Sequence, residues 1–127
     1  MYIPKPFEVQ DKAELFSFIE RWGFGELITC AQGEINISQV PFLVDAEKGV
    51  LYGHLAKQND QLMRLEQADD LMVVFKGPDA YVSPSWYQSE NMVPTWNFQL
   101  VQVKGKVSIV GEQELLRIID GLSRKHE

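Results

Sequence analysis

The chain has 127 residues, of which 45% are hydrophobic and 24% charged, and its formal net charge is −6. This composition is typical of a soluble globular protein with one core, and the acidic balance argues against direct binding of this domain to DNA. Its single cysteine, Cys30, excludes an internal disulfide, and no apolar run is long enough to cross a membrane. We therefore expect a cytoplasmic protein without a membrane partner.

The first half of the chain is expected to form a helix followed by three antiparallel strands. Asp11 followed by Glu14 resembles a capping box, which marks the start of the helix, and apolar residues then recur at helical spacing. The dipeptide Gln32-Gly33 predicts a tight turn between two strands. The expected elements are a helix over 12–22 and strands over 24–31, 34–44 and 50–56.

The strand over 34–44 contains a change of phase in its apolar pattern. Ile35 and Ile37 share one parity, whereas the later apolar residues, Val40, Phe42 and Val44, share the other. Because successive side chains of a strand point to opposite faces, one extra residue near Ser38-Gln39 would bring both groups to the same face. The pattern predicts a β-bulge there, and bulges often lie beside functional sites.

The second half is expected to contribute two strands and two helices. Asn59 is a favourable N-cap for a short helix with Leu62 and Leu65 inward. The expected elements are helices over 60–66 and 112–125 and strands over 71–76 and 99–110. In the last strand Gly105 permits a bend, and the residues expected to face inward are Val101, Val103, Val107 and Ile109. Antiparallel strands with short connections predict a mainly β fold, a small β-barrel with peripheral helices.

The segment from His54 to Asn59 is a candidate phosphate site. A strand ends near Lys57 and leads directly into the start of a helix. Free backbone N–H groups at a helix start, together with an ammonium group, attract a phosphate. Asn59 either caps the helix or donates its amide to the ligand. The alternative is a surface lysine beside an ordinary helix cap.

Two further stretches, 77–87 and 93–97, combine aromatic rings with proline, hydroxyl and amide groups. Such a combination suits a flat polar ligand with an aromatic ring system, although an irregular aromatic loop over the core would have the same composition. Ser83 and Ser85 are expected on one side of an extended segment. The remaining candidates are Trp86, Thr95, Trp96 and Asn97, and each tryptophan would either stack on a ligand or pack in the core.

No arrangement of nucleophile and base, and no cluster with metal-ligand spacing, stands out in the sequence. Asp69-Asp70 is expected to be a solvated pair at the start of a strand rather than a catalytic dyad. The residues therefore do not decide whether the protein is an enzyme, and they favour a protein without catalytic side chains. A bound redox cofactor would bring its own chemistry.

Taken together, several motifs resemble the PaiB-like family of FMN-binding negative transcriptional regulators. The motifs span essentially the whole chain and are Met-Tyr-Ile-Pro-Lys at 1–5, Val-Pro-Phe-Leu-Val-Asp at 40–45, Gly-His-Leu-Ala-Lys-Gln-Asn at 53–59, Gly-Pro-Asp-Ala-Tyr-Val-Ser-Pro-Ser-Trp-Tyr at 77–87, Val-Pro-Thr-Trp-Asn at 93–97 and His126-Glu127. The long central motif makes the resemblance specific.

The resemblance implies an FMN-binding split barrel that forms a homodimer with flavin at the subunit interface, and a role in repressing sporulation and degradative-enzyme genes. It places His54, Lys57 and Asn59 at the flavin phosphate. It places Ser83, Ser85, Trp86 and Thr95 to Asn97 near the flavin or the dimer seam. Family members often carry a histidine where this chain has Gln39, so we expect an altered contact with the edge of the flavin ring.

Family chains usually continue for several tens of residues, with a further strand. We therefore expect residues 1–127 to form a single split-barrel domain without the family's C-terminal segment. Two other functions remain open at this point. One is a flavin-dependent oxidoreductase related to pyridoxamine phosphate oxidase and the flavin reductases, and the other is a cofactor-free dimeric interaction domain.

Overall fold

Six strands arranged in two sheets form the centre of the computed structural model, which describes residues 1–68 and 70–127. The strands are β1 (Phe24–Ala31), β2 (Glu34–Pro41), β3 (Leu43–Asp45), β4 (Val50–Tyr52), β5 (Asp70–Val82) and β6 (Thr95–Gly105). The large sheet has the order β2-β1-β5-β6, and the small sheet pairs β3 with β4. Among the described residues no strand pairing joins the two sheets, so the expected mainly β split barrel is confirmed.

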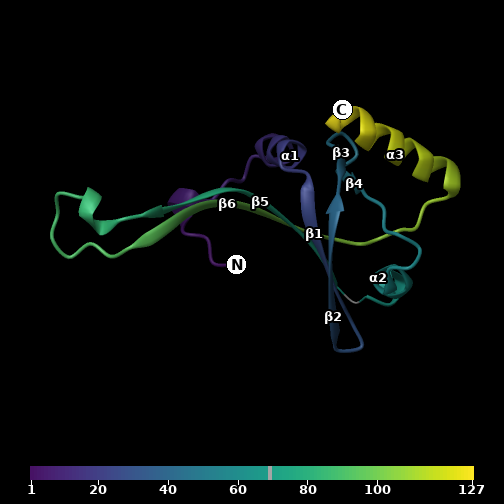
Figure 1. Ribbon diagram of the computed structural model, residues 1–127, viewed down its shortest axis with the longest axis horizontal. Coiled ribbons are helices and arrows are strands. Elements are labelled where there is room, and N and C mark those ends of the chain that lie inside the picture. Colours follow the sequence, from purple (N-terminus) through teal and green to yellow (C-terminus); the bar gives the residue numbers. More distant parts are fainter. Residues whose placement is uncertain (69) are drawn as a thin grey trace.

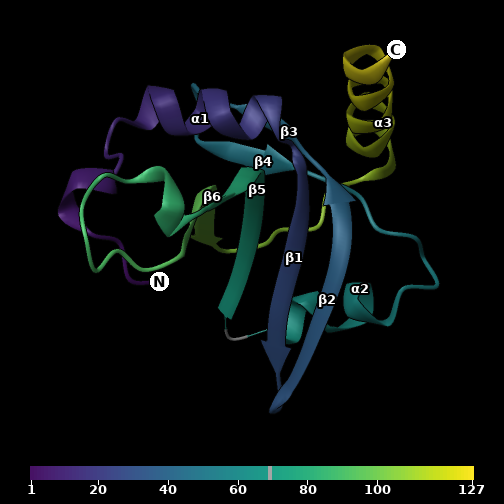
Figure 2. The same ribbon diagram turned by 60° about the vertical axis from the view of Figure 1, so that its left-hand side comes forward.

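Helices lie around the sheets as expected. They are α1 (Lys12–Arg21), α2 (Asp60–Arg64) and α3 (Glu112–His126), with short 3-10 turns at Lys5–Phe7, Leu65–Gln67 and Pro84–Trp86. Figure 2 shows α1 crossing one end of the sheets, while α2 lies toward the other end. Within the described part of the chain, no helix has the length and apolarity needed to cross a membrane. Asp70 begins β5, whereas Asp69 and the side chain of Asp70 lie outside the described residues, so the prediction of a solvated pair stays untested.

Local signals in the sequence correctly located the starts of two elements. The Asp11 carboxylate accepts a hydrogen bond from the Ala13 backbone N–H at 3.0 Å and caps α1. Gln32 and Gly33 both have positive φ, 53° and 78°, as the predicted two-residue turn between β1 and β2 requires. Both features depend only on residues close in sequence, which explains why the pattern was sufficient.

The predicted β-bulge near Ser38-Gln39 is wrong. β1 and β2 pair without a shift along their whole length. The change of phase instead records a change of face, because Ile35 and Ile37 lie on the outer face of the sheet, 68% and 61% exposed, whereas Val40 points into the core. The predicted strand 34–44 also breaks at Phe42, where the chain passes from the large sheet to the small one.

The core is centred on Phe75, whose side chain is completely buried. Its ring contacts the Phe42 ring edge-on, with the ring centroids 5.5 Å apart. A Cβ atom at Gly25 would lie 2.7 Å from Phe75 Cε1, so only glycine fits beneath this ring. The other members of the core cluster come from α1, from the segment after α2 and from the large sheet: Ile19, Leu27, Val40, Leu65 and Val73. Val44 and Leu51 of the small sheet pack against the cluster. This cluster therefore joins the sheets and their covering helices.

The predicted bounds of two further strands need correction. β4 ends at Tyr52 instead of residue 56, and β6 runs from Thr95 to Gly105 instead of over 99–110. Val107 and Ile109 consequently lie after the strand and are exposed. Helix α3 is confirmed, with Ile118 and Leu122 buried and Ile119 exposed.

The distal halves of β5 and β6 form a two-stranded arm, which we define as residues 79–98. Its strands pair from Asp79 with Phe98 to Val82 with Thr95, after an irregularity between Lys76 and Asp79. Figure 1 shows the arm reaching away from the rest of the molecule, with its connecting turn at the far left. Residues 77–87 and 93–97, for which an irregular aromatic loop was one interpretation, therefore belong largely to a β-ribbon that projects beyond the core.

Replacing Phe75 by alanine should destabilise the protein by about 3–5 kcal/mol, because it opens a cavity where two sheets and a helix meet. Urea unfolding followed by circular dichroism measures this change. Phe7→Ala is the matched control, since Phe7 is exposed and outside the core cluster. Equal stabilities of the two variants would contradict the assigned core.

Candidate functional site

The candidate phosphate segment is a short connection between β4 and α2. Gly53 to Ala56 lead away from β4, Lys57 and Gln58 form a turn, and Asn59 is the N-cap of α2. The Asn59 backbone N–H donates to the Ala56 carbonyl at 2.9 Å and closes the turn. His54 and Lys57 are both exposed. Lys57 therefore lies at the surface two residues before the N-cap of α2, and His54 lies three residues earlier in the same connection.

The Asn59 side chain is committed to the fold on both of its polar atoms. Its Oδ1 accepts from the Gln61 backbone N–H at 2.9 Å, which confirms the predicted cap. Its Nδ2 donates to Ser38 Oγ on β2, also at 2.9 Å. Of the two roles considered for Asn59, capping is the one observed, and the additional bond to Ser38 fixes the segment against the large sheet.

Gln61 is a second anchor, which the sequence pattern did not reveal. Its side chain is only 2% exposed, and its Nε2 lies 3.0 Å from the Leu27 carbonyl, Thr29 Oγ1 and the Asn36 carbonyl. These acceptors belong to β1 and β2. A glutamine in the first turn of a helix normally faces solvent, so no local signal distinguished this one.

Gln39 lies apart from the anchored segment. Alternation along β2 places it on the face opposite Ser38, where its Nε2 donates to Glu26 Oε1 on β1 at 3.1 Å. Its contact with a flavin ring edge remains a prediction. The structure assigns Gln39 to the outer face of the large sheet together with Ile35 and Ile37.

The turn at the end of the arm contains the two serines. Ser83 caps the 3-10 turn Pro84–Trp86, and its Oγ accepts from the Ser85 backbone N–H at 3.3 Å. The two hydroxyl oxygens are 2.8 Å apart and share a hydrogen bond. The serines therefore do lie on one side, as predicted, but because the backbone turns between them rather than because it is extended.

Both tryptophans of the arm are exposed, which rules out core packing for either within this chain. Trp86 is 70% exposed and Trp96 is 58% exposed. Trp96 pairs across the ribbon with Tyr81, and their rings meet edge-on with centroids 5.7 Å apart. Thr95 and Asn97 lie on the other face of the ribbon, because neighbouring residues alternate.

Within a single copy of the chain, the structure does not bring all the candidate residues together at one site. Figures 1 and 2 both show α2, which follows Lys57 and Asn59, and the turn of the arm on opposite sides of the molecule. The candidates thus form a basic group at the start of α2 and an aromatic, hydroxyl-rich group on the arm. The described residues contain no group of three or more His, Cys, Asp or Glu side chains placed to hold a metal.

Comparisons with known proteins match the whole chain to one family. A family model described as "Putative FMN-binding domain" matches residues 1–127. The Bacillus subtilis protein named "Protease synthase and sporulation protein PAI 2" is 38% identical over 129 residues, which cover all of this chain and 62% of the relative. An uncharacterised protein of Saccharomyces cerevisiae is 30% identical over 153 residues, covering all of this chain and 90% of that relative.

Replacing Gln61 by leucine should destabilise the protein by about 1–3 kcal/mol, because buried acceptors on β1 and β2 would lose their donor. Thermal unfolding is the measurement. Gln58→Leu makes the same chemical change at an exposed position three residues earlier and should have little effect. A Gln61→Leu variant as stable as Gln58→Leu would show that the side chain does not anchor α2.

Proposed function

The chain belongs to this family of FMN-binding domains, and we propose that it binds FMN as a homodimer in which each site is shared between two copies. The supporting observation is the separation of the two groups of candidate residues. FMN has a phosphate at one end and a ring system at the other, and each group suits one end. In a single chain the groups lie on opposite sides of the molecule.

In this proposal the phosphate is held at the start of α2. Within the described residues, no carboxylate lies within 4.0 Å of the Lys57 ammonium, so its charge is available to a ligand. His54 adds a second donor beside it. Asn59 positions this segment through its bonds to Gln61 and Ser38, which use only one of the two hydrogens on its Nδ2.

The ring system is placed against the arm of the second copy. Trp86 and Trp96 present large exposed aromatic surfaces, which favour stacking. Ser83, Ser85, Thr95 and Asn97 supply hydroxyl and amide groups for the ring edge and the ribityl chain, and Gln39 lies on the outer face of the sheet. When bound, the flavin supplies electron-transfer chemistry, and these side chains bind and orient it.

The outer face of the large sheet is well suited to pairing with a second copy. Ile28 lies opposite Ile37 on β2 and Met72 on β5, and Phe24 and Ile35 are exposed on this face. Exposed apolar side chains gathered on one face favour an interface, and a two-fold axis would pair this face with itself. The same dimer would allow each arm to reach its partner.

We further propose a regulatory role in the cytoplasm. The Bacillus subtilis relative is named for protease synthesis and sporulation, and this chain covers 62% of its length. With a net charge of −6, the domain is poorly suited to contacting DNA itself. Regulation would then act through a partner protein, with flavin binding as the controlling input.

Lys57→Ala should weaken FMN binding about tenfold to a hundredfold, since it removes a charge-assisted contact to the phosphate worth about 1.5–3 kcal/mol. Quenching of flavin fluorescence on titration measures the affinity. Lys106→Ala, which removes an exposed lysine outside the site, is the matched control. If neither the parent nor the variants bind FMN, a cofactor-free interaction domain becomes the better description.

A mixed dimer of Lys57→Ala and Trp96→Ala chains should recover one site of parental affinity per dimer, although both homodimers bind weakly. One of its shared sites receives both substitutions, and the other receives an intact Lys57 and an intact Trp96 from different chains. Co-expression with two affinity tags isolates the mixed dimer for titration. No recovery in the mixed dimer would place the complete site within one chain.

A further inference from the structure

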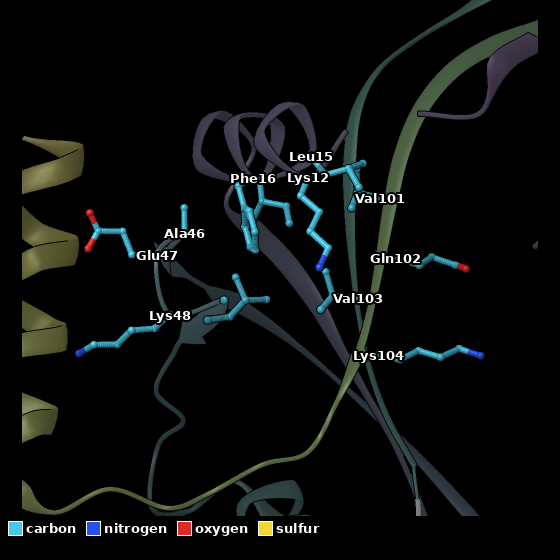
Figure 3. Close-up of a pocket in the computed structure, with 13 residues that line it drawn as sticks. Lys12, Leu15, Phe16, Ala46, Glu47, Lys48, Val101, Gln102, Val103 and Lys104 are labelled. Atoms are coloured by element: carbon cyan, nitrogen blue, oxygen red, sulfur yellow. The ribbon is translucent and has the colours of Figure 1, made fainter. Parts of the chain in front are cut away.

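A cavity of about 570 Å³ opens between α1, the turn that joins β3 to β4, and β6 (Figure 3). Its volume is within the range of small-molecule sites, roughly 300–1,000 Å³. None of the residues expected at the flavin lines it. Contributors include Lys12 and Phe16 of α1, Ala46 of the turn, Leu51 of β4, and Val101 and Val103 of β6.

The inner wall of the cavity is continuous with the core. Leu51, Val101 and Val103 line the cavity and also pack against the core cluster, and Ile19 belongs to both. Among the described residues, β4 pairs only with β3, and β6 pairs only with β5. Each of these two strands therefore has one unpaired edge, and the two strands lie on either side of the cavity. An occupant would bury aliphatic surface and meet backbone donors and acceptors at these edges.

The charge that faces the cavity is positive. Figure 3 shows the Lys12 ammonium pointing into the cavity, whereas the side chains of Lys48, Glu47 and Lys104 point away from it. Among the described residues no carboxylate lies within 4.0 Å of the Lys12 ammonium. A cation at the mouth of an apolar cavity complements a ligand with one anionic end and an apolar body.

We propose that this cavity binds an amphipathic monocarboxylate, with the carboxylate at Lys12 and the apolar body against Leu51, Val101 and Val103. The site is distinct from the proposed flavin site. It connects to the arm through its own walls, since α1 and β6 line the cavity and the Phe18 ring of α1 lies against Gly77 at the base of the arm.

Decanoate is the probe, and decanol is its uncharged counterpart. Two-dimensional NMR of the labelled protein should show saturable shifts at Leu15, Leu51 and Val103 on titration with decanoate. Lys12→Gln should weaken decanoate binding about threefold to tenfold, as expected for a partly solvated ion pair, and should leave decanol binding unchanged. Lys48→Gln makes the same charge change at a side chain that points away, so its decanoate affinity should equal the parent's.

Three further measurements complete the test. Ala46→Phe should abolish binding of both probes, because Ala46 is an exposed turn residue at the mouth of the cavity. Lys12→Arg retains the charge and should retain binding, which guards against misfolding of the glutamine variant. Decanoate affinity should be the same with and without FMN. The proposal is overturned if shifts at the cavity do not saturate, if Lys12→Gln and Lys48→Gln behave alike, or if decanoate displaces FMN.

Discussion

The contact between the Phe42 and Phe75 rings holds the two sheets of this protein together. Phe42 lies where the chain leaves the large sheet for the small one, and Phe75 lies in the middle of β5. The Phe42 backbone N–H also donates to the Gly23 carbonyl at 2.8 Å, directly after α1. Because β4 leads to α2 and β5 leads to the arm, this one contact sets the positions of both candidate binding groups.

The two groups are supported in different ways. The start of α2 is fixed by buried or part-buried hydrogen bonds from Asn59 and Gln61 to the large sheet, so it is a rigid platform for a charged ligand group. Within the described part of the chain, the arm is held by its own ladder, the Tyr81–Trp96 contact and the hydrogen bonds between Ser83 and Ser85. Its aromatic side chains are exposed. A preorganised anchor and an exposed ribbon are the two complementary parts that the proposed shared site requires.

Local chemistry determined which features the sequence could predict. Caps at Asp11 and Asn59 and the turn at Gln32-Gly33 involve neighbouring residues and were correct. The bulge was wrong because apolar residues on an outer face, such as Ile35 and Ile37, resemble a slip in register. The arm was missed because proline, serine and aromatic residues in this order are typical of loops. The separation of the phosphate and ring groups depends on tertiary positions, which no local pattern encodes.

The projecting arm also has a thermodynamic consequence. If its aromatic surface is covered only in a dimer, then ligand binding and subunit association are linked equilibria, and each strengthens the other. The cofactor would hold the subunits together, and dilution would release it. The amount of protein in the cell would thereby become part of the signal, since occupancy would respond to the concentration of the chain as well as to that of the flavin.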